Sequence, residues 1–288
     1  MRILVTGATG YVGRNVLPQL VSAGVDVRAL TRDPARAKVP AGVDLVRGDL
    51  SRPDSLSEAL EGVERMYLFP APETAREVVA RAVKAGVRRI VVLSSGAVTT
   101  GYDTDFHLPV ERAVEESGLE WTHVRPGEFA TNTLHMWAPS IRAESAVYDP
   151  HPDAVGVPTH ERDVADIAAL ALLEDGHTGK AYTIVGPQPL THAEQLEAIA
   201  AAVGRELSFK DVTAQEALAY YQALGGWAAA NAPFLLGLVT YSNEETTPEA
   251  EHQYDKDTVE EHPTAESVTN RPGRTFAQWA QDHADDFR

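Results

Sequence analysis

Three glycines near the start of the chain have a spacing that could hold a diphosphate. Residues 7–13 read Gly-Ala-Thr-Gly-Tyr-Val-Gly, directly after the short apolar run at 3–5. In such a G-x-x-G-x-x-G pattern, the first glycine permits a tight turn and the second lets the backbone approach a pyrophosphate. The third lets the following helix pack closely on the strand. The N-terminus of that helix favours negative charge. We predict a dinucleotide site, with a turn that binds nothing as the alternative; its loop contacts are Gly7, Thr9, Gly10, Tyr11, Val12 and Gly13.

The residue that follows the second predicted strand indicates which dinucleotide binds. Sites specific for NAD usually carry an acid there, which accepts a hydrogen bond from the ribose 2′-hydroxyl. This chain has Arg32 instead, with Arg36 and Lys38 nearby. A guanidinium can bind a 2′-phosphate with two hydrogen bonds. We therefore predict NADP(H) as the preferred cofactor, with NAD(H) as the alternative; Asp33, which precedes Pro34, is predicted to be the N-cap of a short helix.

Four further residues follow predicted strands and are expected at the same edge of the sheet. Asp49 is expected near the adenine, or else as a turn former, and Phe69 is expected to line the cleft by apolar contact. Ser94 and Ser95 stand at the end of the fifth predicted strand. Their hydroxyls could bind the cofactor ribose or an acceptor oxygen, although capping of the strand end is an equal alternative.

Strands and helices alternate along the first half of the chain. Runs that are apolar throughout and separated by helices indicate parallel strands covered on both faces. This pattern predicts an α/β fold, a Rossmann-type doubly wound parallel sheet, whose ligands lie beyond the carboxyl ends of the strands. The predicted strands cover residues 3–5, 25–31, 43–47, 65–69, 89–94 and 121–125, and the helices between them include 12–21, 73–85 and 109–117.

The rhythm changes after about residue 126. We expect residues 1–130 to form the NAD(P)-binding core, and residues 131–288 to form a smaller α/β substrate lobe interleaved with it. Expected elements are a helix at 163–173 capped by Asp163, a strand at 181–185, and a helix at 191–203 with a capping box of Thr191 and Glu194. One helical face near the end predicts a docking helix; its residues are Phe276, Trp279, Ala280, His283 and Phe287.

Composition excludes several classes of function. The chain of 288 residues has 25 Lys+Arg and 42 Asp+Glu, a net charge of −17, which argues against direct binding of nucleic acid. It contains no cysteine, so a disulfide framework and a thiolate metal site are excluded. No apolar run is long enough to span a membrane, and we recognise no signal peptide, so we expect a cytoplasmic protein. We expect no metal site. The acidic run at 243–262 is predicted to be a solvated surface, with a docking site as the alternative.

Taken together, the motifs resemble the NmrA-like group of atypical short-chain dehydrogenases/reductases. The resemblance covers nearly the whole chain and includes Thr6-Gly7-Ala8-Thr9-Gly10, Thr31-Arg32-Asp33-Pro34, Arg47-Gly48-Asp49-Leu50, Leu93-Ser94-Ser95, Arg125-Pro126-Gly127, Arg162-Asp163-Val164-Ala165 and Gly273-Arg274-Thr275-Phe276. It implies an NADP-binding protein. Some members of the group reduce quinones or related acceptors, and others bind the nucleotide without turnover and act as redox-sensing regulators.

The chain departs from the wider superfamily at the catalytic pair. Short-chain dehydrogenases usually carry Tyr-x-x-x-Lys, in which the lysine lowers the tyrosine pKa. Here His107 and Glu111 occupy those positions. A conjugated acceptor such as a quinone or enone needs less help from a strong acid than a ketone does. We hypothesise that His107 donates the proton or orients the acceptor, that Glu111 tunes it, and that Ser94 assists; simple packing of His107 is the alternative.

The substrate is expected to contact the second half of the chain. Candidate pocket residues are Phe129, Asn132, Trp137 and Trp227, and aromatic residues at such positions also serve as lobe core. We predict an NADPH-dependent oxidoreductase that transfers hydride to an electron-poor conjugated small molecule. Two alternatives are a catalytically weak NADP(H) sensor that regulates a protein partner, and a non-redox lyase, epimerase or cyclase. A homodimer is compatible with the sequence.

Overall fold

The chain divides into two compact units. The computed structural model describes residues 1–239, 245 and 263–288. The first unit comprises Met1–Pro126, Glu161–Ile184 and Ala265–Arg271, and the second comprises Gly127–His160, Val185–Thr264 and Pro272–Arg288. The first unit thus consists of one long N-terminal segment, which ends at Pro126, and two shorter segments from later in the chain.

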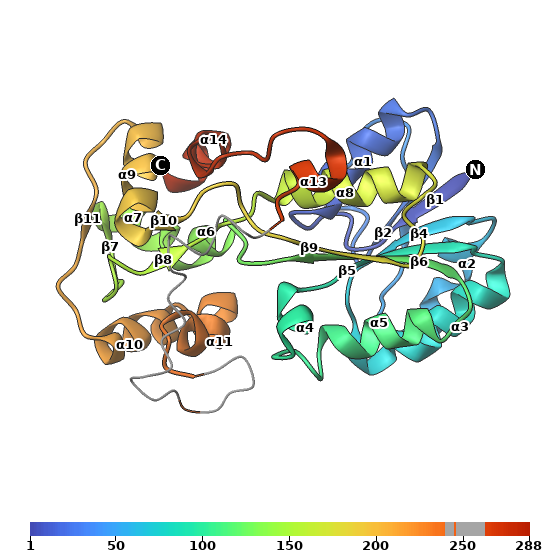
Figure 1. Ribbon diagram of the computed structural model, residues 1–288, viewed down its shortest axis with the longest axis horizontal. Coiled ribbons are helices and arrows are strands. Elements are labelled where there is room, and N and C mark those ends of the chain that lie inside the picture. Colours follow the sequence, from blue (N-terminus) through green and yellow to red (C-terminus); the bar gives the residue numbers. More distant parts are fainter. Residues whose placement is uncertain (240–244, 246–262) are drawn as a thin grey trace. The chain divides into compact units, whose positions relative to one another are not determined.

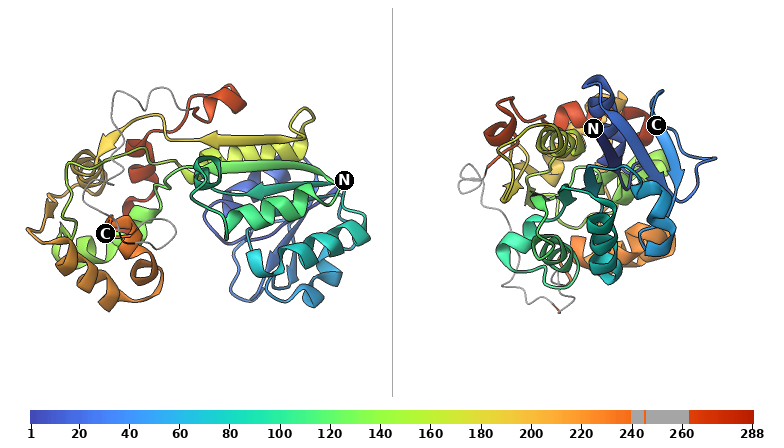
Figure 2. Two further views of the ribbon diagram at one scale, coloured as in Figure 1. Left: turned by 60° about the horizontal axis from the view of Figure 1, so that its bottom comes forward. Right: turned by 90° about the vertical axis from the view of Figure 1, so that its right-hand side faces the viewer.

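The first unit is built on one parallel sheet (Figure 1). The strand order is β3-β2-β1-β4-β5-β6-β9, and every neighbouring pair is parallel. The strands are β1 (Arg2–Val5), β2 (Asp26–Thr31), β3 (Asp44–Arg47), β4 (Arg65–Leu68), β5 (Arg89–Leu93), β6 (Glu120–Pro126) and β9 (Lys180–Ile184). Figure 2 shows β9 at the edge beside β6. The predicted doubly wound fold is confirmed, and all carboxyl ends meet at one edge.

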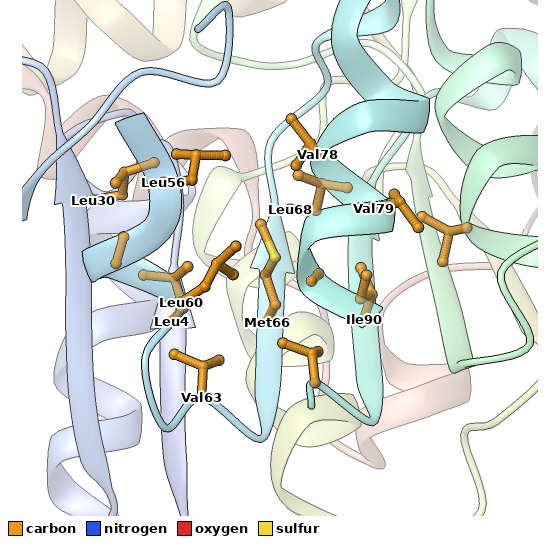
Figure 3. Packing of buried hydrophobic residues seen from close by; sticks show 14 of the residues in the cluster. Leu4, Leu30, Leu56, Leu60, Val63, Met66, Leu68, Val78, Val79 and Ile90 are labelled. Atoms are coloured by element: carbon orange, nitrogen blue, oxygen red, sulfur yellow. The ribbon is translucent and has the colours of Figure 1, made fainter. Parts of the chain in front are cut away.

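One face of this sheet packs against the helices on its lower side in Figure 1. Successive side chains of a strand point to opposite faces, and Leu4, Met66 and Ile90 point to the same one. They pack with Val78 and Val79 of α3 (Figure 3). The elements on this side are η1 (Pro53–Leu56), α2 (Ser57–Leu60), η2 (Pro72–Thr74), α3 (Ala75–Ala85) and α5 (His107–Glu115).

The opposite face is covered by α1 (Gly13–Ser22) and α8 (Glu161–Leu173) (Figure 1). Leu17 and Leu20 of α1 and Ile167 of α8 are fully buried. The amide of Gln19 donates to the Asp166 carboxylate at 2.7 Å, so the two helices are also joined by a polar contact. The short helices α4 (Gly96–Thr100) and α13 (Glu266–Thr269) complete the unit.

The described residues of the second unit are mainly helical and form two small sheets. β8 pairs antiparallel with β10, and β7 pairs parallel with β11. Its elements are α6 (Asn132–Met136), α7 (Ala138–Glu144), β7 (Ala146–Val147), β8 (Val155–Gly156), β10 (Leu190–Thr191), α9 (His192–Val203), β11 (Ser208–Phe209), α10 (Ala214–Leu224), α11 (Gly226–Leu235), α14 (Phe276–Asp282) and η3 (Ala284–Phe287).

The apolar face predicted near the end of the chain lies on α14 and η3 and is buried. All five of its residues are buried, and Trp279 and Phe287 are completely inaccessible. The helix α14 packs against α9. The predicted capping box is confirmed as well, because the Thr191 hydroxyl accepts from the Glu194 N–H while the Glu194 carboxylate accepts from the Thr191 N–H.

Two local predictions are wrong. The helix α8 begins at Glu161, so Asp163 lies in its first turn rather than at the N-cap. Acids are favoured throughout the first turn by the helix dipole, and sequence alone cannot separate these positions. Asp33 and Pro34 begin a turn rather than a helix. The Asp33 carboxylate accepts from the Ala35 N–H at 3.2 Å, so its side chain stabilises that turn.

Two further predictions concerned the acidic run near the end of the chain and the absence of a membrane-spanning segment. The acidic run at 243–262 lies outside the described residues, apart from Glu245. Among the residues that the structure describes, no helix has the length and apolarity that crossing a membrane requires.

Candidate cofactor and active site

The glycine loop is shaped by close contacts of its own backbone. Gly7 has a backbone φ of +58°, a conformation that residues other than glycine rarely adopt. A Cβ atom on Gly13 would lie 2.3 Å from the Gly7 carbonyl oxygen, so only glycine fits there. The Gly10 N–H donates to that same oxygen at 2.9 Å. The loop therefore presents bare backbone at the start of α1, as a diphosphate site requires.

A second contact fixes this loop against β4. The Thr6 hydroxyl donates to the Tyr67 carbonyl at 2.9 Å and accepts from the Phe69 N–H at 2.7 Å. A Cβ atom on Gly7 would lie 3.0 Å from atoms of the Phe69 side chain. Phe69 is nevertheless 43% exposed. It thus offers an apolar surface directly beside the loop, where the sequence predicted apolar contact.

A pocket of about 670 Å³ opens beyond the ends of β2 and β3. Arg32, Arg47 and Arg52 line it together with Asp49. Hydrogen bonds from the Ser51 hydroxyl and N–H hold the pKa of Asp49 below its ordinary value, and Arg52 and Arg32 add to this effect. Asp49 therefore forms a turn with Ser51 while it also lines the pocket. The pocket is large enough for part of a nucleotide, and its lining combines these arginines with the acids Asp49, Asp54, Glu58 and Glu77.

Arg47 is a pocket residue that sequence reasoning missed. It is the last residue of β3, and its side chain is exposed. The alternation of buried Val46 and exposed Arg47 at the carboxyl end of the strand is the signal that could have identified it.

The two serines after β5 have different roles. The Ser95 hydroxyl accepts from the Ala97 N–H at 3.2 Å and so caps α4. Ser94 is 2% exposed and its N–H donates to the Val124 carbonyl at 2.8 Å. The Ser94 hydroxyl helps to lower the pKa of nearby Glu111, yet it makes no hydrogen bond of good geometry to any described residue. A buried hydroxyl of this kind is available to a bound ligand.

Glu111 is committed to an ion pair with Arg125. Its carboxylate accepts from Arg125 Nε at 2.8 Å and from Nη2 at 2.5 Å. Burial acts to raise the pKa of Glu111, but the hydrogen bonds from Arg125 and the nearby His123 hold it below its ordinary value. Arg125 also donates to the Thr99 hydroxyl at 3.1 Å. Glu111 is therefore ionised, and the positive charge of Arg125 balances its negative charge.

His107 contacts the carboxylate of Asp103, a residue that the sequence analysis did not single out. Its Nδ1 lies 2.5 Å from the carboxylate of Asp103, a residue that is completely buried. Burial holds the pKa of His107 below its ordinary value, while Asp103 and, more weakly, Glu111 act to raise it. Asp103 is therefore the carboxylate in contact with His107, while both Glu111 oxygens bind Arg125 and Glu111 acts on the His107 ring only through its charge.

These residues meet at the edge of the sheet where ligands of this fold bind. The helix α5 follows β5 and starts at His107, so its first two turns lie near the carboxyl ends of β5 and β6. Glu111, one turn into the helix, contacts Arg125 at the end of β6 and interacts with Ser94 after β5. The glycine cradle and the buried Ser94 hydroxyl fit a nicotinamide dinucleotide.

One group of side chains has the composition of a metal site. Ligand atoms of Glu111, Glu115 and His123 lie within 4.8 Å of one another. Arg125 already binds both oxygens of Glu111, and its charge disfavours a cation beside it. We therefore interpret the group as part of the ion-pair network.

The four predicted substrate residues all lie in the second unit. Trp137 is buried, with its ring edge-on to His192 and Phe209, so it belongs to the core of that unit. Trp227 of α11 is 38% exposed and stacks on His135 of α6 at 4.6 Å. Asn132 begins α6, and its N–H donates to the Phe129 carbonyl at 3.0 Å. Among these four, Asn132 and Trp227 belong to two helices that pack on each other.

The second unit also contains an acid–base cluster that the sequence did not reveal. His192 Nδ1 lies 2.9 Å from the Asp149 carboxylate. Burial opposes the charge of His192, but Asp149 and the neighbouring Glu128 raise its pKa above the ordinary value. Burial raises the pKa of Glu128. The three residues are distant in sequence, and no spacing rule connects them.

Comparisons with known proteins agree with this geometry. Residues 7–175 match the family described as NAD(P)H-binding. The chain belongs to this NAD(P)H-binding family. The match spans the glycine loop, both arginine-bearing strand ends, Ser94 and the α5 residues.

Named relatives cover the whole chain. A (4-alkanoyl-5-oxo-2,5-dihydrofuran-3-yl)methyl phosphate reductase of Streptomyces griseus is 37% identical, over 99% of both chains. An NAD(P)H azoreductase of Xenophilus azovorans is 33% identical, again over 99% of both chains. The solved NADPH-dependent quinone oxidoreductase of Escherichia coli has a TM-score of 0.72 and 24% identity, over 97% of this chain and 98% of that one.

The fold is also shared with the solved structure of Nmra, a negative transcriptional regulator, at 17% identity and a TM-score of 0.67, as the predicted resemblance implies. The chain is an NAD(P)H-dependent oxidoreductase, as its family and its reductase relatives together indicate.

Proposed function

We propose that this protein is an NADPH-dependent reductase of electron-poor, conjugated small molecules. The observation that carries the acceptor class is the ion pair of Glu111 and Arg125. At the position where related dehydrogenases have a lysine, this chain has a neutralised carboxylate. The proton-transfer machinery beside it is the pair of half-buried His107 and buried Asp103. Such a site suits acceptors that spread negative charge over a conjugated system.

The preference for NADPH rests on the arginine-lined pocket. Arg32 and Arg47 follow or end neighbouring strands β2 and β3, and both line the same cavity. A 2′-phosphate placed between two guanidinium groups accepts several charge-assisted hydrogen bonds. The remaining surface of the protein is acidic overall, with a net charge of −17. Although Asp49, Asp54, Glu58 and Glu77 line the same cavity, the guanidinium groups of Arg32 and Arg47 offer the hydrogen-bond donors that favour the phosphorylated cofactor.

The bound cofactor supplies hydride, and the protein residues provide position and proton transfer. The glycine loop and α1 hold the diphosphate, while Phe69 covers it with an apolar surface. Ser94 offers its buried hydroxyl to the cofactor ribose or to the acceptor oxygen. His107 delivers the proton that balances hydride addition.

The relatives support the same acceptor class. The substrate in the name of the Streptomyces griseus enzyme has a ring double bond conjugated to carbonyl groups. Quinones and azo compounds, which the other two names mention, are conjugated as well. In all three classes the charge left by hydride addition is delocalised. We propose a butenolide or enone as the acceptor of this chain, with quinones and azo compounds as competing candidates.

The test is an absorbance assay at the reduced-nicotinamide band. The purified protein is given NADPH or NADH with an alkanoyl butenolide, a quinone, an azo dye, and a saturated ketone as the matched non-conjugated control. We expect turnover with at least one conjugated acceptor, no turnover with the ketone, and a higher kcat/KM with NADPH. Reduction of the ketone at a comparable rate, or turnover of none of the conjugated acceptors, would refute the proposal.

A further inference from the structure

A completely buried carboxylate controls the proton on His107. Asp103 lies in the loop before α5 and has 0% exposure. One of its oxygens accepts from the N–H groups of Phe106 and His107, at 3.0 Å and 2.9 Å. The other lies 2.5 Å from His107 Nδ1. Asp103 therefore binds the backbone and the ring of the same histidine, which fixes the orientation of the ring.

This arrangement decides which ring nitrogen carries a proton. An ionised carboxylate only accepts hydrogen bonds, so Nδ1 must donate its proton to Asp103. Burial acts to raise the pKa of Asp103, but its hydrogen bonds with His107 and with the backbone keep the pKa below its ordinary value. In the neutral ring, Nε2 then has a lone pair. In the protonated ring, Nε2 carries the exchangeable proton and Asp103 stabilises the cation.

We infer that Asp103 is the positioning residue of the site: it holds the Nδ1 proton of His107, so that Nε2 is the atom that takes up and releases the catalytic proton. The catalytic part rests on the proposed function. The His107 side chain is 16% exposed, so solvent can return the proton after each turnover. Asp103 is four residues before His107, whereas the sequence analysis considered Glu111, four residues after it.

The step balances as a two-electron reduction. Hydride from the nicotinamide adds to the electron-poor carbon of the acceptor, which breaks one π bond and leaves an enolate or phenolate anion. The Nε2–H bond of protonated His107 breaks, and its proton neutralises that anion. His107 is left neutral, with Nδ1 still bound to Asp103, until water reprotonates it. The acceptor gains two electrons and two hydrogens, and the nicotinamide is oxidised.

Few charged groups act on this ring. Among the described residues these are Asp103, before the helix, and Glu111, one turn along it. Glu111 is neutralised by Arg125 from β6. The Phe106 ring packs edge-on at 4.8 Å and contributes no charge. Removal of the Asp103 charge should therefore dominate any change in the titration of His107.

The experiment compares Asp103→Asn with Asp105→Asn, which removes an exposed acid of the same loop. The asparagine keeps an oxygen for the two backbone N–H groups. Nitrogen-15 NMR of the cofactor-free proteins distinguishes the histidine tautomers, and His107→Gln assigns the signals. We expect wild-type His107 to carry its neutral-state proton on Nδ1. In Asp103→Asn we expect a mixture of tautomers and a His107 pKa about one unit lower, while Asp105→Asn changes neither.

The outcomes separate this inference from the proposed function. A proton on Nε2 of neutral wild-type His107 overturns the inference, and this measurement needs no variant that might misfold. An unchanged tautomer and pKa in Asp103→Asn overturn it as well. The titration is measured without acceptor, so a failure to find turnover refutes only the proposed function. Where turnover is found, the alkaline fall of kcat should move to lower pH in Asp103→Asn.

Discussion

The Glu111 carboxylate accepts two hydrogen bonds from Arg125, at 2.8 Å from Nε and 2.5 Å from Nη2. Its side chain is 1% exposed and that of Arg125 is 17% exposed. Two charges that are this poorly hydrated depend on each other. The pair thus sets the electrostatics of the site and also ties α5 to β6.

Breaking this pair should destabilise the protein strongly. Arg125→Met leaves Glu111 buried without its partner, and we expect the free energy of unfolding to fall by about 3–5 kcal/mol. The double variant Glu111→Gln/Arg125→Met removes both charges and should recover a large part of that loss. Urea unfolding followed by circular dichroism provides the measurement. Equal losses in the single and double variants would contradict the view that uncompensated charge is the cause.

The close approach within the glycine loop predicts a selective loss of cofactor binding. In Gly13→Ala the new Cβ would lie 2.3 Å from the Gly7 carbonyl, so the loop or α1 must move. We expect the Kd for NADPH, measured by calorimetry, to rise at least tenfold. Gly24→Ala is the control, because Gly24 has a φ of +71° with nothing near its Cβ position. That control should lose about 1–2 kcal/mol of stability and keep its affinity.

Arg47 should contribute to cofactor selectivity as Arg32 does. We expect Arg47→Ala to raise the Kd for NADPH about tenfold, corresponding to about 1.4 kcal/mol. The Kd for NADH should stay unchanged, because that cofactor has no 2′-phosphate. Arg36→Ala is a matched control, since Arg36 is exposed and does not line the pocket. A parallel loss of NADH affinity in Arg47→Ala would mean that the arginine shapes the pocket rather than binding the phosphate.

The ion pair of His192 and Asp149 predicts a pH-dependent stability. The pKa of His192 is raised, so its contribution is complete below the unfolded value of about 6.5 and is lost as pH rises through the folded pKa. The pKa of Asp149 is lowered, so its contribution is complete above about 3.9 and is lost as pH falls through the folded pKa. The pair should therefore stabilise most between about pH 4 and 6.5.

Comparison of wild type with His192→Gln tests this window. The difference in unfolding free energy should be largest near pH 5 and should shrink towards pH 9. Asp149→Asn should abolish the same pH dependence, because it removes the partner that holds the proton on His192. A difference that does not vary with pH would show that His192 acts through packing on Trp137 alone.

Much of the fold could be predicted because its signals are local. The apolar runs and the glycines that end helices gave the strands and the parallel sheet. The capping box at Thr191 and the apolar face ending at Phe287 could also be predicted, since each depends on residues a few positions apart. The position of Asp163 in its helix could not be predicted, because an acid anywhere in the first turn satisfies the same electrostatic preference.

The sequence by itself determined the shape of the glycine loop, because Gly7 and Gly13 lie within one strand–turn–helix unit and act on each other over six residues. It also placed His107 and Glu111 on one helix. Only the tertiary structure decided their partners. Arg125 reaches Glu111 from another strand, and Asp103 binds His107 through a loop whose course no periodicity predicts. The strength of a charge pair depends on the distance between the two groups and on their burial, and residue spacing predicts neither of these quantities.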